Sequence, residues 1–223
     1  MQVGETIYLD YQASTPMDER VMQIMQVASA TCFANPHAAD HTLGWRAAAA
    51  IKMAADQVGK LFGLQGDDVI FTSGASEANT VAIRTAEAIA AHSQCTDLLI
   101  GAADHGSILN EAAQSHLTAR HIPLDERGAP DPVCLSAMIS DNTALVSIVG
   151  VNNENGAIAD LKTISDICQT NGVLFHADLS QAPLAIDIDL LDLNIAFATV
   201  SSHKIYGPKG VGALLTGPGM SES

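Results

Sequence analysis

Aromatic residues are scarce in this sequence: Phe, Trp and Tyr make up 4% of its 223 residues. A core built mainly from large rings is therefore excluded, and Ala, Ile, Leu and Val must fill the interior. Apolar residues nevertheless account for 48% of the chain, which is too large a share for a disordered polypeptide. The length suffices for one large domain with a substantial core, or for two small ones.

Basic residues are also few. The chain has 10 Lys and Arg against 25 Asp and Glu, which gives a formal net charge of −15. Nucleic-acid binding depends on Lys and Arg that neutralise phosphates, so this composition argues against it. An acidic surface solvated by water explains the charge, and docking to a basic partner protein is the alternative.

The four cysteines occur singly, without a C-x-x-C pair, at Cys32, Cys95, Cys134 and Cys168. This spacing predicts neither a disulfide framework nor a zinc site, and we predict no other metal site. A buried structural thiol is the expected state of all four.

Long apolar runs and a basic leader are absent as well. No run approaches the roughly 20 residues of a membrane span. Glu5 and Asp10 stand where a secretory leader would be basic and then apolar. We therefore expect a cytoplasmic protein with no membrane association.

Short apolar runs alternate with helical patterns along most of the chain. Strands are predicted over residues 69–72, 98–101, 119–123, 145–151, 173–177, 195–200 and 212–215. Helices are predicted over residues 20–28, 45–62, 78–91, 108–117, 132–139 and 161–169. Apolar strands separated by helices predict an α/β fold, a mostly parallel central sheet with helices on both faces. We expect one domain over residues 17–216, preceded by an N-terminal segment (1–16) and followed by a polar tail (217–223).

Small polar residues follow the first of these strands. In open α/β sheets, ligands bind at the carboxyl ends of the strands. The segment Ser73–Ser76 stands between this strand and the next helix, where close backbone approach and free N–H groups favour a phosphate. The alternative is an ordinary serine N-cap with the nearby Glu77.

Three further predicted strands are followed by polar residues that could bind a ligand or transfer a proton. His105 could stack on a planar ring or carry a proton. Asp178 could pair with a protonated pyridine nitrogen. The amides of Asn152–Gly156 could hold a phenolic oxygen or a carboxylate. Each set also has a local explanation: a loop residue, a helix cap and an Asn-Gly turn, respectively.

A lysine follows the apolar run 195–200. Lys204 lies between hydroxyl and imidazole groups in Ser201–Gly210, before a Gly-Pro-Lys-Gly turn. An amine in this setting can form a Schiff base with an aldehyde cofactor. Because each of these polar sets follows a predicted strand, we interpret them as one site at a single edge of the sheet.

Several segments, spread over nearly the whole chain, carry a resemblance to a known family. They are Tyr8–Pro16 (YLDYQASTP), Asn35–Ala38 with His41 and Gly44–Trp45, Phe71–Asn79 (FTSGASEAN), Val151–Gly156 (VNNENG), His176–Gln181 (HADLSQ) and Ser202–Gly210 (SHKIYGPKG). In this order they resemble the cysteine desulfurases, a branch of the class V aminotransferases that use pyridoxal 5'-phosphate (PLP). The resemblance implies that residues 17–216 form the PLP-binding large domain of the aspartate-aminotransferase type.

The resemblance also implies a role for each site residue. Lys204 would hold PLP covalently and then move protons at the substrate's α-carbon, and His105 would stack on the ring. Asp178 would pair with the pyridine nitrogen, and Gln181 would bond the phenolic oxygen. Asn153 would lie where the substrate carboxylate enters. The phosphate would be bound by Ala75, Ser76, Ser201 and His203.

The implied reaction converts L-cysteine to L-alanine. The sulfur passes to an enzyme cysteine as a persulfide, for iron–sulfur cluster assembly or thiolation pathways. The family resemblance further implies a homodimer with active sites at its interface, and a sulfur-acceptor protein.

Several departures from the family are visible. In the family, a long section follows the strand that resembles Gly210–Leu215, and it bears the nucleophilic cysteine; we find no match to it here. Of the four cysteines, only Cys32 could replace that nucleophile. Ser76 stands where the family more often has threonine, and Asp104–Gly106 where it usually has Glu-His-Lys.

These departures leave three interpretations. The chain is the PLP-binding part of a cysteine desulfurase, completed by a further segment or by a separate, complementing protein. Alternatively, it is a short homologue that binds PLP or a partner without turnover. The third possibility is another class V enzyme, such as a selenocysteine lyase or an aminotransferase. We expect no family-like sulfide release from this chain alone.

Overall fold

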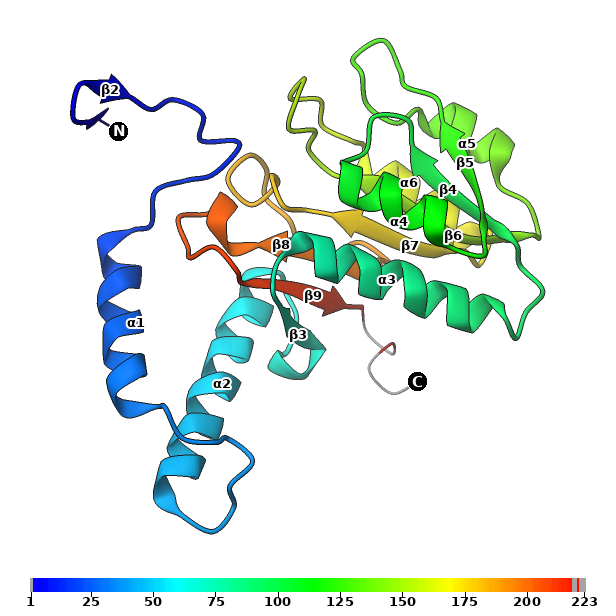
Figure 1. Cartoon of the computed structure of the whole chain (residues 1–223). Helices are drawn as coiled ribbons and strands as arrows, with labels where there is room; N and C mark the ends of the chain where they lie inside the picture. The colour runs from blue at the N-terminus through cyan, green and yellow to red at the C-terminus, as the bar shows by residue number, and fades with distance from the viewer. Residues whose placement is uncertain (1, 218–219, 221–223) are drawn as a thin grey trace.

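A seven-stranded sheet organises the chain in a computed structural model that describes residues 2–217 and 220. The strands lie in the spatial order β3-β9-β8-β7-β6-β4-β5 (Figure 1). Their bounds are β3 (Val69–Thr72), β4 (Asp97–Gly101), β5 (Thr118–Ile122), β6 (Thr143–Val149), β7 (Leu174–Asp178), β8 (Phe197–Ser201) and β9 (Gly212–Thr216). A separate hairpin joins β1 (Gln2–Val3) to β2 (Thr6–Ile7).

The predicted fold class is confirmed. Strands β5, β4, β6, β7 and β8 pair in parallel, whereas β9 pairs antiparallel with both β8 and β3. Two antiparallel steps make β3 run in the same direction as β8. The carboxyl ends of β3, β4, β6, β7 and β8 therefore meet at one edge of the sheet, as the sequence predicts.

Helices cover both faces of the sheet. One layer contains α3 (Ala75–Ala90) and α4 (Gly106–Gln114), and the other contains α5 (Pro132–Met138) and α6 (Leu161–Thr170) (Figure 1). Alternate residues of a strand pack against the two helix layers, because successive side chains point to opposite faces. In β4, for example, Leu98 and Ile100 pack with α3 and α4, whereas Leu99 packs in the core that α5 and α6 share.

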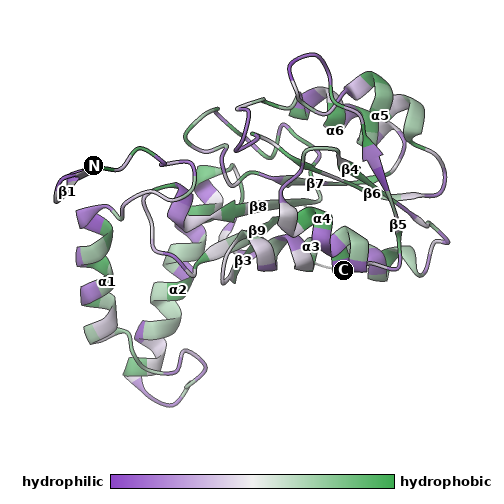
Figure 2. Cartoon of the chain, turned by 45° about the horizontal axis from the view of Figure 1, so that its top comes forward, coloured by the Kyte–Doolittle hydropathy of each residue, from purple (hydrophilic) through white to green (hydrophobic). Residues whose placement is uncertain are grey.

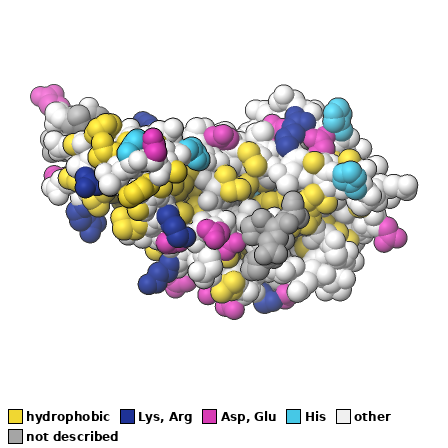
Figure 3. Space-filling model, turned by 90° about the horizontal axis from the view of Figure 1, so that it is seen from below, with side chains coloured by type: hydrophobic (Ala, Val, Ile, Leu, Met, Phe, Trp, Pro, Cys, Tyr) yellow, Lys and Arg dark blue, Asp and Glu magenta, His cyan; other side chains and the backbone are white. Residues whose placement is uncertain are grey.

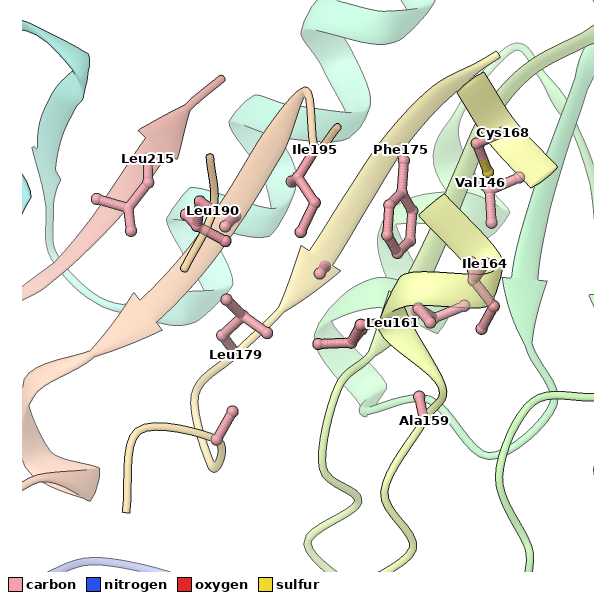
Figure 4. Close-up of a cluster of buried hydrophobic side chains, with 14 of the residues drawn as sticks. Val146, Ala159, Leu161, Ile164, Cys168, Phe175, Leu179, Leu190, Ile195 and Leu215 are labelled. Carbon is pink, nitrogen blue, oxygen red and sulfur yellow. The ribbon is translucent and has the colours of Figure 1, made fainter. Parts of the chain in front are cut away.

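The core beneath α6 is aliphatic with one central ring. Phe175 of β7 lies against Ile164 and Cys168 of α6, with Leu161 and Leu179 nearby (Figure 4). All five are at most 6% exposed. Burial of aliphatic side chains at this density supplies most of the fold's stability, as the scarcity of aromatic residues requires.

Two further helices extend away from the sheet. They are α1 (Glu19–Thr31), which has no buried residue, and α2 (Thr42–Leu61), which packs beside β3 (Figure 1). Apolar residues nevertheless occur along both helices (Figure 2). Ile24 and Val27 of α1 are 69% and 63% exposed, and Trp45 of α2 is 57% exposed. The face over these two helices consequently presents a broad apolar surface (Figure 3).

The N-terminal segment returns to the sheet edge through backbone contacts. The Thr15 N–H donates to the His203 carbonyl at 2.9 Å, and the Asp18 N–H donates to the Tyr206 carbonyl at 3.0 Å. Of the predicted polar tail, residues 218, 219 and 221–223 lie outside the described residues. None of the helices within the described ranges is long and apolar enough to span a membrane.

Candidate functional site

The predicted site residues converge on one cavity of about 560 Å³ at the carboxyl edge of the sheet. Its lining includes all nine of them: Ala75, Ser76, His105, Asn153, Asp178, Gln181, Ser201, His203 and Lys204. They come from segments up to about 130 residues apart in the chain, so only the parallel arrangement of the strands brings them together.

The turn after β3 places the N-terminus of α3 at this cavity. Gly74 occupies the N-cap with φ 154° and ψ −177°, and no side chain caps the helix. The serine N-cap interpretation is therefore wrong; instead, the Glu77 carboxylate accepts from the Ser73 N–H. A helix start without a side-chain cap leaves its first N–H groups free to bind an anion.

Four polar atoms of residues at the same cavity are buried without a protein partner. They are Ser14 Oγ, Ser180 Oγ, Ser201 Oγ and His203 Nδ1, and all four residues line the cavity. Burying such atoms is costly unless they bind something. Burial, with Lys204 and Lys209 nearby, lowers the pKa of His203. These hydroxyl and imidazole groups, together with the N-terminus of α3, fit a phosphate.

Lys204 contacts a residue of the Tyr8–Pro16 segment to which the sequence assigned no role. Its Nζ donates to the Gln12 carbonyl at 2.5 Å, and Gln181 Nε2 donates to the same oxygen at 2.7 Å. Burial lowers the pKa of the Lys204 amine, although the carboxylates of Asp178 and Asp10 oppose this shift. A larger neutral fraction makes the amine a better nucleophile.

Asp178, the last residue of β7, is 4% exposed. Its Oδ1 accepts from the Ser180 N–H at 2.9 Å, and its Oδ2 accepts from Asn79 Nδ2 at 2.8 Å. The alternative that Asp178 caps a following helix is wrong, because residues 179–196 contain no helix. A buried carboxylate with two donors is suited to bind a cationic group in the cavity.

His105 forms the N-cap of α4, with its Nδ1 accepting from the Ser107 N–H at 3.1 Å. It is therefore a cap as well as a lining residue of the cavity. In the loop after β6, Asn152 makes the turn by accepting from the N–H groups of Glu154 and Asn155. Among the described amides of this loop, only Asn153 lines the cavity, so the loop makes a turn and also places one amide where a ligand could reach it.

Two titratable side chains lie beneath the cavity, and the sequence assigned neither a role. Asp104 accepts from the N–H groups of Gly101 and Val149, both at 2.9 Å. Burial raises its pKa to about 7. His176 is fully buried, with Ser147 Oγ 2.8 Å from Nδ1 and Thr199 Oγ1 3.1 Å from Nε2. Burial lowers its pKa, so the ring is neutral.

No cysteine is among the residues that line the cavity in the described part of the chain. Cys168 is buried, and burial raises its pKa to about 12. The pKa of Cys134 is raised mainly by a hydrogen bond to Asp131, and burial raises it further. The expectation that all four thiols are buried is wrong for Cys32, Cys95 and Cys134, which are half-buried.

Other residues of the site had only weak signals in the sequence. Lys209 and Gly210 line the cavity from the Gly-Pro-Lys-Gly turn that marked Lys204. Ser14 lies in the Tyr8–Pro16 segment, which had a family resemblance but no assigned role. Gln12 lies in the same segment, but its carbonyl could not be assigned a role, because any residue offers a backbone oxygen.

Comparison with known proteins gives consistent matches. A family model described as aminotransferase class-V matches residues 7–222. Cysteine desulfurase IscS of Rickettsia bellii (strain OSU 85-389) is 40% identical over 211 residues, which cover 93% of this chain and 51% of the relative. IscS of Rickettsia felis (strain ATCC VR-1525 / URRWXCal2) matches with the same identity and coverage. The chain thus spans about half the length of these curated relatives.

Solved structures share the fold. SspA in complex with cysteine has a TM-score of 0.89 and 33% identity, over 95% of this chain and 61% of that one. A NifS-like protein has a TM-score of 0.90 and 28% identity, over 96% of this chain and 59% of that one. A NifS-like protein from Rickettsia africae ESF-5 has a TM-score of 0.83 and 30% identity, over 94% of this chain and 57% of that one.

Proposed function

Since the chain belongs to the class V aminotransferase family, we propose that its cavity binds PLP and serves the chemistry of a cysteine desulfurase. The observation that carries the proposal is the conjunction of three groups in one cavity. These are the Lys204 amine, the Asp178 carboxylate and a set of buried polar atoms without partners beside a helix N-terminus. The first suits an aldehyde, the second a pyridine nitrogen and the third a phosphate, and PLP contains all three.

The phosphate group of PLP would be bound by the N-terminus of α3. Ala75 and Ser76 offer N–H groups of its first turn. Ser201 and His203 add side-chain donors from the end of β8. Lys209, which also lines the cavity, adds positive charge.

The ring end would lie between His105 and the carboxylate of Asp178. His105 would stack on the ring, and Gln181 would bond its phenolic oxygen. Asp178 would hold the proton on the pyridine nitrogen, and PLP, when bound with that nitrogen protonated, supplies an electron sink for charge developed at the substrate's α-carbon.

Lys204 would carry the proton transfers. Burial lowers the pKa of its amine, so a larger share is neutral near pH 7 and able to attack a carbonyl carbon. After exchange with the amine of a substrate, Lys204 Nζ would take a proton from the substrate's α-carbon and return it. The Gln12 carbonyl, which accepts from Nζ, would orient the amine for these transfers. Asn153 would bond the substrate carboxylate.

The proposed substrate is L-cysteine. In the desulfurase reaction a thiolate would attack the sulfur of cysteine, so that a sulfur–sulfur bond forms as the carbon–sulfur bond breaks. The electron pair of the broken bond stays with the carbon skeleton, the β-carbon takes up a proton, and L-alanine leaves. Iron–sulfur cluster assembly and thiolation pathways would use that sulfur through an acceptor protein. A second copy of the chain is the proposed partner in the resting protein, because the apolar faces of α1 and α2 are exposed.

A second candidate function follows from the cysteines. No thiol lines the cavity in the described ranges, so the nucleophile would come from another segment or from a complementing protein. By itself the chain would then bind PLP without desulfurating cysteine.

Borohydride trapping tests the proposal. The purified chain is incubated with PLP, reduced and digested, and the modified peptide is identified by mass spectrometry. We expect PLP on Lys204 and its loss in Lys204→Ala. Lys162→Ala is the matched control, because Lys162 pairs with Asp166 on the surface of α6. Equal labelling of wild type and Lys204→Ala would refute the proposed site.

A further inference from the structure

A side chain on α3 joins the two groups that would flank the cofactor ring. Asn79 is 0% exposed and lies on the second turn of the helix that begins at the phosphate end. Its Nδ2 donates to Asp178 Oδ2 at 2.8 Å and to Ser107 Oγ at 2.9 Å. One amide group therefore contacts β7 and α4 together.

The link continues to His105. Ser107 Oγ lies 2.8 Å from His105 Nδ1, and the Ser107 N–H donates to the same nitrogen. That nitrogen must therefore be an acceptor, which places the neutral ring's proton on Nε2. The Ser107 hydroxyl can then accept from Asn79 and donate to His105.

The chemistry of the contacts fixes the orientation of the Asn79 amide. If its oxygen and nitrogen were exchanged, the oxygen would face the Asp178 carboxylate, which only accepts. In the observed orientation both amide hydrogens are used and Asn79 Oδ1 is left buried without a partner. An unsatisfied buried oxygen lowers stability, and a functional role is one explanation for such a group in a native structure.

We propose that Asn79 and Ser107 are positioning residues that tie Asp178 to His105 and so fix both groups around the cofactor ring. The inference rests on the proposed PLP site and adds to it a hydrogen-bonded bridge, Asp178–Asn79–Ser107–His105. Through Asn79 the carboxylate is also anchored to the helix whose N-terminus would bind the phosphate. The spacing between the phosphate end, the ring nitrogen and the stacking face is thus set by one helix.

Two variants separate the arms of the bridge. Asn79→Leu removes both donors at similar volume, and Ser107→Ala cuts only the arm to His105. Thr80→Val is the matched control, because it breaks a hydrogen bond between the same two helices, from Thr80 to Glu111, one residue further along. Ser107→Thr keeps the hydroxyl and should restore wild-type behaviour.

Equilibrium binding of PLP is the first readout. We expect Asn79→Leu to weaken PLP binding by about tenfold or more, since it removes a hydrogen bond to a charged group. Ser107→Ala should weaken it by about threefold, and Thr80→Val should leave it unchanged within about twofold. Equal effects of Asn79→Leu and Thr80→Val would overturn the inference, because the loss would then reflect helix packing alone.

The second readout needs no cofactor. The ¹⁵N chemical shifts of the His105 imidazole are measured in the protein without PLP. We expect these chemical shifts to change in Ser107→Ala and Asn79→Leu and to keep their wild-type values in Thr80→Val and Ser107→Thr. Unmoved shifts in Ser107→Ala would overturn the bridge even if Asn79→Leu failed to fold. If the wild type failed to bind PLP but the shifts moved as expected, the proposed function would fail and the bridge would stand.

Discussion

At the scale of single residues, the two buried titratable groups beneath the cavity respond to pH in opposite directions. Burial raises the pKa of Asp104 from 3.8 to about 7. Between those values the native protein holds a proton that the unfolded chain has released, so stability falls as pH rises. Burial lowers the pKa of His176. The unfolded chain then binds the extra proton in acid, so this group's contribution rises with pH toward neutrality.

Replacing Asp104 with Asn should remove the first dependence and leave the second. The free energy of unfolding is measured by urea denaturation of both proteins without PLP. We expect the wild-type value minus the variant value to fall by about 3 kcal/mol between about pH 4 and pH 7. The contribution of His176 is common to both proteins and cancels in this difference. Parallel pH profiles would show that Asp104 is not a buried, protonated carboxyl near neutrality.

At the scale of elements, the start of α3 depends on a close approach of two glycines. An added Cβ on Gly212, the first residue of β9, would lie 2.7 Å from Gly74 Cα and 2.8 Å from the Val200 carbonyl oxygen. Both neighbours are backbone atoms, which cannot rotate away. The Ser73–Ser76 turn therefore keeps its place only while position 212 has no side chain.

Gly212→Ala should push this turn outward. We expect the free energy of unfolding of the variant to fall by about 1–3 kcal/mol, as it does at overpacked sites. We also expect the folded variant to bind PLP more weakly than the folded wild type. Gly106→Ala is the control, because its added Cβ would meet only Asn110 Nδ2, at 4.0 Å. Unchanged PLP binding by folded Gly212→Ala would mean that the turn's position is unimportant.

Most elements could be predicted from the sequence, because their signals are local. Apolar runs gave all seven strands of the main sheet, and the largest shifts are those of the 145–151 run, to Thr143–Val149, and of the 195–200 run, to Phe197–Ser201. The serine cap failed because the backbone of Gly74 starts the helix without any side chain. The position of the polar sets at strand ends predicted a single site, and the family resemblance named the nine residues that line the cavity.

The remaining site contacts could not be predicted, because they depend on packing between distant segments. Asn79 ends the Phe71–Asn79 motif of the family resemblance but was assigned no role, because its contacts arise only where α3 meets β7 and α4. The Gln12 carbonyl reaches Lys204 only after the N-terminal segment folds back. His176 shares its strand face with Asp178, but its hydroxyl partners come from two neighbouring strands.

At the scale of the whole molecule, the helices α1 and α2 expose many apolar side chains, which gather on one face (Figure 3). Soluble monomers rarely expose contiguous apolar patches of this kind. The proposed homodimer would cover part of it. The net charge of −15 opposes association of two copies, so the apolar face would have to supply the attraction.

Placing a charge on this face should separate the copies. We expect the wild type to sediment as a dimer and Ile24→Glu with Val27→Glu to sediment as a monomer. Val133→Glu is the control: Val133 is 78% exposed on α5, and this variant should remain dimeric. A wild type that is monomeric at every concentration tested would remove the homodimer from the proposal.

The proposed cofactor site is tested most directly by one absorbance measurement on the purified chain. PLP is added, the excess is removed, and the visible spectrum is recorded before and after L-cysteine, with L-alanine in a parallel sample. We predict a band that Lys204→Ala lacks and that L-cysteine shifts. We also predict no sulfide release above the PLP-only control, because no thiol lines the cavity in the described ranges. A wild-type spectrum identical to that of Lys204→Ala would contradict PLP binding at Lys204.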